Sequence, residues 1–212
     1  MVTGRRQGLH ASLTRMVSFE EPDAELVSRH RAVARIDARL ILESQSGNRL
    51  NAVLGSGLDQ YAEEGFPEEW KLHHQGGLTG YGGREIFATP RAEHRLEANQ
   101  VVAWNPSITR VKSEDTVLIG TKGPEVLTMS DSWPLRTVGL PAARCSAPRS
   151  WRGEPGTTTA GVGTSWNQTH AGKPSDQSLT ARVPLTSPAS SLHTFFASSL
   201  SVRSMGDVSA MS

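Results

Sequence analysis

The chain has 212 residues, of which 36% are hydrophobic, a fraction somewhat low for a fully globular protein. Its 22 basic and 21 acidic residues give a formal net charge of +1, so charge gives no argument for nucleic acid or an anionic membrane surface as a partner. No apolar run approaches the roughly 20 residues that span a bilayer, and the basic start lacks the apolar core of a signal peptide. We therefore expect a cytoplasmic protein.

The first part of the chain predicts one strand and two helices. Residues 8–19 alternate apolar and polar positions imperfectly, as a bent strand does. Acidic residues then crowd a first helical turn, and apolar residues recur at helical spacing up to a stop at residues 46–47. A second helical face ends at Gly65, and two such helices need a sheet to cover. His30 and Asp37 lie near the first apolar stripe, where we expect solvated or capping side chains.

The stretch from residue 70 to residue 116 contains the chemistry-bearing residues. It holds adjacent histidines, five glycines within eight residues, and β-branched runs at 100–104 and 116–119 that predict strands. The stretch has a histidine before a glycine-rich turn and, later, a Glu-Asp at the start of a strand. Imidazole and carboxylate groups suit a divalent metal, but this spacing alone is a weak signal. Adjacent strand residues face opposite sides, so at most one of His73 and His74 can enter a given pocket. The residues alone favour a structural histidine. A phosphate-binding loop is disfavoured because no Gly-Lys-Ser/Thr ending follows the glycines.

This stretch resembles the C-terminal half of the pita-bread metallopeptidases, which include methionine aminopeptidase, Xaa-Pro aminopeptidase, prolidase and creatinase. The sequences HHQGG, GYGGRE and KSEDTVLI carry the resemblance, which runs from about Gly8 to Pro134. It implies an α+β fold: a truncated, partial pita-bread domain in residues 1–138, with a curved antiparallel sheet backed by helices. A low-complexity, disordered tail is expected over residues 139–212. Family members use divalent metals (Mn, Co, Fe or Zn) to cleave an N-terminal residue or an Xaa-Pro bond.

The resemblance also implies five metal-ligand positions, of which this chain keeps two, His74 and Glu114. Ser12 stands where the family has a bridging Asp, and Asn105 stands where it has the Glu of a Glu-Pro motif. The family's other Asp lies on a preceding strand, which we expect at or before Met1 and therefore missing. Neutral side chains bring no charge to offset divalent cations, and two ligands rarely hold a catalytic metal.

Four charged or polar residues in or near this ligand set carry further expectations. Tyr81 stands where the family has a second, substrate-contacting His, and a phenol with a pKa of about 10 is a poorer proton shuttle near neutrality. Arg84 and Glu85 are expected to form an ion pair that closes the glycine turn. Glu114, without its metal, is expected to lack counter-ions.

These substitutions predict a metallopeptidase-like protein that is catalytically degenerate, a pseudoenzyme. One alternative is an active metal-dependent Xaa-Pro peptidase or amidohydrolase that uses His74 and Glu114. Another is a non-enzymatic module that binds a peptide or small amide under the glycine turn. Many relatives dimerise, so the resemblance also allows a homodimer.

Overall fold

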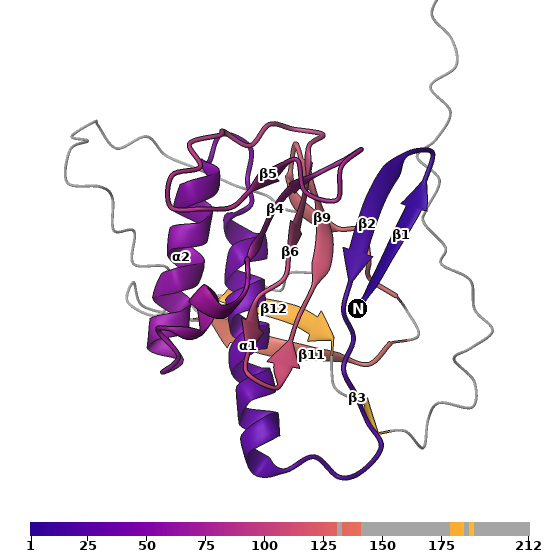
Figure 1. Cartoon of the computed structure of the whole chain (residues 1–212), viewed down its shortest axis with the longest axis vertical. Coiled ribbons are helices and arrows are strands. Elements are labelled where there is room, and N and C mark those ends of the chain that lie inside the picture. The colour runs from indigo at the N-terminus through magenta and orange to yellow at the C-terminus, as the bar shows by residue number, and fades with distance from the viewer. Residues whose placement is uncertain (131–132, 141–178, 185–186, 189–212) are drawn as a thin grey trace, which may run out of the picture.

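The computed structural model describes residues 1–130, 133–140, 179–184 and 187–188, which form two α-helices, a 3-10 helix, one five-stranded sheet and several two-stranded sheets (Figure 1). In chain order, the elements are β1 (Val2–Arg6), β2 (Leu9–Leu13), β3 (Val17–Ser18), α1 (Ala24–Glu43), α2 (Leu50–Glu63), the 3-10 helix η1 (Glu69–Leu72), β4 (Gly76–Thr79), β5 (Ile86–Phe87), β6 (Val101–Trp104), β7 (Ser107–Ile108), β8 (Val111–Lys112), β9 (Asp115–Gly120), β10 (Gly123–Val126), β11 (Leu135–Leu140), β12 (Leu179–Pro184) and β13 (Ser187–Pro188).

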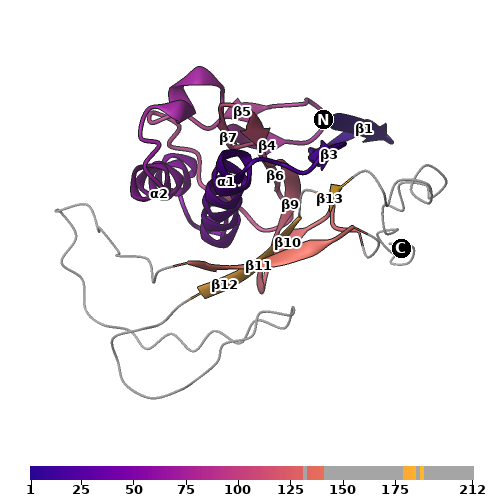
Figure 2. The same cartoon turned by 90° about the horizontal axis from the view of Figure 1, so that it is seen from below.

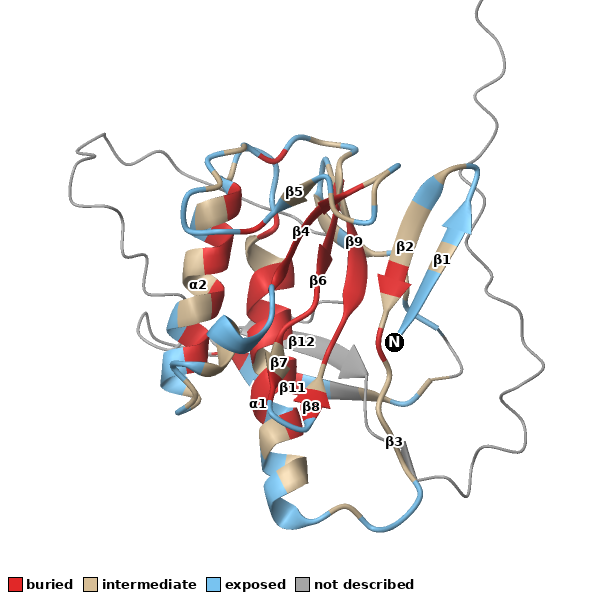
Figure 3. Cartoon of the chain, in the orientation of Figure 1, coloured by how far each residue is buried: buried red, intermediate tan, exposed pale blue. Residues whose placement is uncertain are grey.

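A five-stranded antiparallel sheet, in the order β10-β9-β6-β4-β5, is the centre of the fold. Its inner strands β4, β6 and β9 are largely buried, whereas β1 is mostly exposed (Figure 3). The β1–β2 hairpin lies against the beginning of β9, where Thr14 forms an isolated antiparallel bridge with Glu114, the residue just before that strand. The two strands predicted around residues 100–104 and 116–119 are thus confirmed as β6 and β9.

Both predicted helices are present and pack together along one side of the central sheet (Figure 1). Asp23 caps α1, since its carboxylate accepts the backbone N–H of Leu26 at 2.6 Å. The helix ends at Ser44, whose hydroxyl donates to the Leu40 carbonyl and accepts the indole N–H of Trp104 at 2.7 Å. Because Trp104 is fully buried on β6, this bond fixes the end of α1 against the sheet.

A second layer covers the opposite side of α1. The β11–β12 ribbon lies along this helix, away from β4 and β5 (Figure 2). Small residues on α1, Ala34 and Ala38, make room for Val138 and Leu140 of β11. β12 and β13 fall in the segment where we expected a disordered tail; the other residues after 140 lie outside the described residues. Within the part that the structure describes, no helix is long and apolar enough to cross a membrane.

Candidate functional site

Two consecutive glycines set the path of β4 beside the candidate site. Gly76 and Gly77 have φ values of +119° and +144°, which side chains of L-residues rarely tolerate. A Cβ at Gly76 would lie 2.1 Å from the carbonyl oxygen of Ala103, and one at Gly77 would lie 2.0 Å from that of Ile86. The glycines therefore let β4 run between β5 and β6 at close range, directly after the paired histidines.

Strand register brings two of the expected site positions, Asn105 and Glu114, onto neighbouring strands. Trp104 pairs with Asp115 across β6 and β9, so the residues flanking this pair, Asn105 and Glu114, are cross-strand neighbours. On the other side of Glu114, the Thr14 backbone N–H donates to the Glu114 carbonyl at 3.0 Å. The register thus places Glu114 between β2 and the end of β6.

The carboxylate of Glu114 is 2% exposed and is surrounded by donors. Its Oε2 accepts the hydroxyl of Thr14 at 2.7 Å and lies 3.3 Å from Nζ of Lys112. Its Oε1 accepts from Nη2 of Arg84 at 3.2 Å. The side chains of Arg84 and Lys112 are only 9% and 19% exposed. The expectation that Glu114 lacks counter-ions is therefore wrong, because two cations from other strands and loops reach it.

The same contacts overturn the expected pairing of Arg84 with Glu85. Glu85 instead accepts the backbone N–H groups of Tyr81 at 2.9 Å and Gly82 at 3.4 Å, which closes the glycine turn without a cation. Arg84 turns inward, where a charge pair in a low-dielectric environment interacts more strongly than one in water. Sequence adjacency suggested the wrong partner.

His74 lies at the exposed edge of this centre. Its ring stacks on His73, with centroids 4.4 Å apart, and meets Phe87 edge-on at 5.2 Å. Partial burial first, and then the positive charges of His73, Arg84 and Lys112, lower the pKa of His74. The imidazole is therefore neutral near pH 7.

The hydrogen-bond partners of Ser12 and Asn105 are neutral groups. The hydroxyls of Ser12 and Thr3 are 3.1 Å apart across the β1–β2 pair, and the Ser12 backbone is bonded to the Thr116 hydroxyl. The strand that pairs with β2 is β1, whose residues Val2–Arg6 include no acid, and the position of the family's other Asp stays a prediction. Asn105 donates its N–H to the Gln75 carbonyl, and its buried Oδ1 has no hydrogen-bond partner among the described residues.

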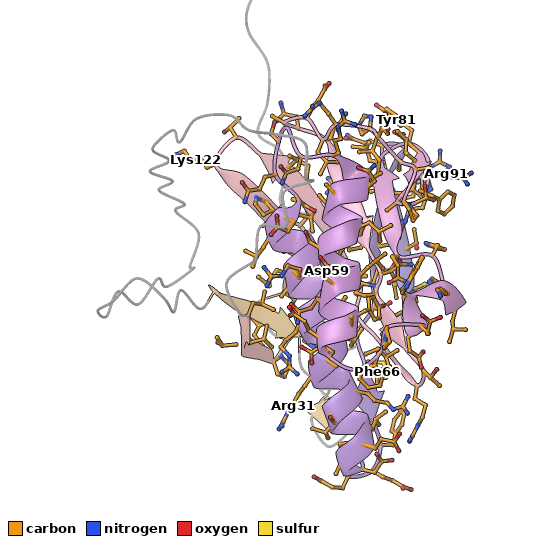
Figure 4. The ribbon with its side chains drawn as sticks, turned by 90° about the vertical axis from the view of Figure 1, so that its left-hand side faces the viewer. Arg31, Asp59, Phe66, Tyr81, Arg91 and Lys122 are labelled. Atoms are coloured by element: carbon orange, nitrogen blue, oxygen red, sulfur yellow. The ribbon has the colours of Figure 1, made fainter. Side chains whose placement is uncertain are left out.

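Tyr81 lies on the surface of the glycine turn. It is 72% exposed, and its ring edge faces Gly8, so that a Cβ there would lie 3.0 Å from the ring (Figure 4). Among the described residues, its hydroxyl forms no hydrogen bond with Glu114 or His74. A role for Tyr81 in place of the family His remains a prediction.

A second acid, Asp37, is buried on α1. The sequence analysis instead expected a solvated or capping side chain at this position. Asp37 is 0% exposed and accepts the hydroxyl of Ser113 at 2.5 Å. Burial, and then the negative charge of Asp115, raises the pKa of Asp37 to about 8. His30, also expected at the surface, is buried as well. The spacing of Asp37 from Val33 and Leu40 puts it on the buried face of α1, a signal that could have corrected both expectations.

Arg15 forms an ion pair with Asp115, which follows Glu114 in the sequence and directs its side chain to the other face of β9. Its guanidinium donates to Asp115 at 2.7 Å and to the carbonyl of Thr128 at 2.9 Å, while the Thr128 hydroxyl donates to Asp115 at 2.6 Å. Burial nevertheless raises the pKa of Asp115. Consecutive residues at the beginning of β9 thus direct one acid to each face, and the two acids pair with different cations: Asp115 with Arg15, and Glu114 with Arg84 and Lys112.

The donor set does not fit the divalent metal that the family resemblance implies. Within the described ranges, no group of three or more His, Cys, Asp or Glu side chains is arranged to hold a metal ion. Glu114, the remaining carboxylate, already faces Arg84 and Lys112, whose charges would repel a divalent cation. Ser12 and Asn105 add no negative charge.

Solved structures with a similar backbone decide the fold. A prolidase from Pyrococcus horikoshii OT3 superposes with a TM-score of 0.56 and 21% sequence identity, over 61% of this chain and 39% of its own. The chain has a partial pita-bread fold. An X-Pro aminopeptidase from Thermotoga maritima MSB8 gives a TM-score of 0.55 and 23% identity over 60% of this chain and 38% of its own. An Xaa-Pro dipeptidase from Bacillus anthracis gives a TM-score of 0.53 and 23% identity over 58% of this chain and 36% of its own.

The similarity to these pita-bread proteins concerns the backbone fold alone, because sequence identities of 21–23% support a shared fold and nothing more. This chain spans less than two fifths of the length of these structures. No family model matches the sequence, and a comparison with curated proteins finds no match. The expected α+β fold, with its curved antiparallel sheet and two backing helices, is confirmed.

Proposed function

We propose that this chain is a metallopeptidase-like protein that does not hydrolyse peptide bonds. One observation carries the proposal: both oxygens of Glu114 are bonded to cationic side chains, Arg84 and Lys112, at 3.2 and 3.3 Å. These two charges stand next to the carboxylate to which a metal would have to bind.

The energetics support this proposal. A metal bound to Glu114 would have to displace Arg84 and Lys112 and leave both charges largely buried without their partner. Breaking one such buried pair costs about 3–5 kcal/mol. Catalytic metal sites normally supply about three protein ligands, and this centre offers one neutral imidazole, His74, and one carboxylate that is already neutralised.

The test combines metal analysis with a peptidase assay on the full chain. Elemental analysis after dialysis against Mn, Co, Fe or Zn should find less than one equivalent of bound metal, and Xaa-Pro dipeptides should remain intact. Glu114→Gln and the exposed control Glu125→Gln should behave like the native chain in both measurements. Metal-dependent cleavage by the native chain that Glu114→Gln abolishes and Glu125→Gln retains would overturn the proposal.

An active metal-dependent peptidase or amidohydrolase is the second candidate. The observation in its favour is His74, because a neutral and accessible imidazole can bind a metal or accept a proton. Under this alternative, His74→Ala should abolish both bound metal and cleavage. Under the first proposal, His74→Ala should change neither quantity.

A further inference from the structure

The tip of the β1–β2 hairpin and the glycine turn meet at one end of the molecule (Figure 1). The backbone N–H of His10 donates to the Gly80 carbonyl at 2.8 Å. The ring of Tyr81 lies beside Gly8 in the hairpin turn, where a Cβ would be 3.0 Å from it. The two turns therefore form one surface, and we call residues 5–9 together with Tyr81 the hairpin tip.

The hairpin tip exposes two large side chains with apolar surface. Leu9 is 48% exposed and Tyr81 is 72% exposed. Both adjoin Gly8, Leu9 as its neighbour in the chain and Tyr81 through its ring. Single exposed apolar residues are common on folded proteins, so these two gain meaning from the charges beside them.

The charges of the hairpin tip are mainly positive. Arg5 and Arg6 are exposed, and neither forms an ion pair within the described ranges. The first 19 residues contain no Asp or Glu. Glu85 in the glycine turn is the one acid that contacts the tip, and its carboxylate accepts the backbone N–H of Tyr81 at 2.9 Å. Two arginines thus face a single carboxylate that backbone donors already occupy.

Further cations lie at the same end of the molecule. Arg91 and Lys122 are near Tyr81 at the upper end of the view in Figure 4, whereas Arg31 is far below them. Both are exposed, and neither has an ion pair in the part of the chain that the structure describes. The acidic residues at 20–25 precede and begin α1 at the opposite end (Figure 1). The net charge of +1 is therefore unevenly distributed over the fold.

A flat anionic lipid surface matches this end of the molecule. Several turns reach one end together, so their arginines and lysine can approach a plane of lipid phosphates at the same time. Tyr81 has an apolar ring and a polar hydroxyl, a combination suited to the boundary between water and lipid. Nucleic acid would also attract the cations and stack on Tyr81, but it offers no apolar layer for an aliphatic side chain such as Leu9.

The depth of such docking is limited by the backbone of the hairpin. Among the described strands, β1 pairs with β2 alone, so the outer edge of β1 carries backbone groups that need water. Side chains at the tip can therefore enter the headgroup level, while the strand itself stays outside the hydrocarbon.

We infer that the hairpin tip docks on the surface of an anionic phospholipid membrane, with Arg5 and Arg6 at the lipid phosphates and with Leu9 and Tyr81 at the headgroup level. The charge of the whole chain gave no argument for such a partner, because the acids that balance these cations lie elsewhere on the fold. This surface goes beyond the proposed function, which rests on the buried Glu114 and its two cations. Failure to dock leaves that function untouched.

The test sediments the full chain with vesicles of phosphatidylcholine alone or of phosphatidylcholine mixed with phosphatidylserine. The chain should bind the mixed vesicles, bind the neutral vesicles much less, and leave the mixed vesicles at high salt, which screens exposed charges. Bicelles of the mixed lipids should broaden the NMR amide signals of residues 5–10 and 80–83. The signals of α2 should stay sharp.

Substitutions separate the charged from the apolar contribution. Arg5→Gln and Arg6→Gln should each lower binding to the mixed vesicles about fivefold. Leu9→Ser should lower binding without changing its dependence on salt. Arg31→Gln, on the exposed face of α1, and Leu72→Ser, at an exposed leucine of η1, are the matched controls and should bind like the native chain (Figure 4).

Three results would overturn the inference. The first is equal binding, or no binding, of the native chain to the mixed and neutral vesicles. The second is an effect of Arg5→Gln and Arg6→Gln no larger than that of Arg31→Gln. The third is native-like vesicle binding by Leu9→Ser together with displacement by a single-stranded oligonucleotide, which would assign the surface to nucleic acid. Because the lipid comparison leaves the protein unaltered, the first result does not depend on the folding of any variant.

Discussion

Arg84 and Glu114 form a buried ion pair, with Nη2 of the arginine 3.2 Å from Oε1 of the carboxylate. The two residues are 30 positions apart in the sequence, and Lys112 completes the arrangement from the other side of the carboxylate. Under the proposed function, these two side chains supply the positive charge that a metal supplies in the resembled family. Glu114 is then a structural anion, and its removal should affect folding directly.

Glu114→Gln should lower the free energy of unfolding by about 3 kcal/mol, because it leaves two largely buried cations without a charged partner. Chemical denaturation at pH 7 measures the change. Glu125→Gln, on the exposed face of β10, should stay within about 0.5 kcal/mol of the native value. An unchanged denaturation midpoint for Glu114→Gln would show that the buried charges of Arg84 and Lys112 do not need the Glu114 carboxylate as their partner.

Gly76→Ala should destabilise the fold by several kcal/mol or prevent folding, because Gly76 has a φ of +119° and a Cβ would lie 2.1 Å from the Ala103 carbonyl. Gly83→Ala is the control from the same glycine-rich stretch, since a Cβ there has no neighbour within 4 Å. Thermal melting of both variants gives the comparison. Equal melting temperatures would contradict the close approach of β4 to β6.

Asp37 should make the native chain less stable as the pH rises from about 4 to about 8. The folded carboxyl, with a pKa of about 8, keeps its proton over this range, while the unfolded carboxyl, near 3.8, has lost it. The folded state then binds more protons than the unfolded state, so stability falls with rising pH. Asp37→Asn should flatten this fall.

Denaturation at pH 4.5, 6 and 8 tests the role of Asp37. Asp59→Asn, on the exposed surface of α2, should keep the native pH dependence (Figure 4). Burial also raises the pKa of Asp115, so some slope of the same sign should persist in Asp37→Asn. If the free energy of unfolding depends on pH in the same way in the native chain and in Asp37→Asn, Asp37 is not the group responsible for the loss of stability.

His74 should titrate below its ordinary pKa of 6.5, since burial and nearby positive charges oppose protonation. Lys112→Gln removes one of those charges and should raise the pKa of His74, while Lys122→Gln should leave it unchanged. NMR titration of the imidazole signals provides the measurement. A fall or no change in the pKa of His74 on Lys112→Gln would contradict the placement of Lys112 beside it.

The local pattern of the sequence determined the secondary elements that depend on neighbouring residues. Apolar residues at helical spacing located α1 and α2, and β-branched runs located β6 and β9, because both signals come from residues within one or two turns or along one strand. The glycine-rich stretch and the KSEDTVLI motif indicated the partial pita-bread fold and the position of Glu114 at the start of β9.

Only the tertiary structure decided which charges meet. Arg84 was assigned to its neighbour Glu85 and Asp37 to the solvent, whereas the fold directs Arg84 to Glu114 and buries Asp37 against Ser113. Such contacts depend on strand register and on the packing of α1, which join residues 30 to 76 positions apart. A buried charge must find a partner wherever the fold places one, so its pairing is a property of the assembled sheet and not of the local sequence.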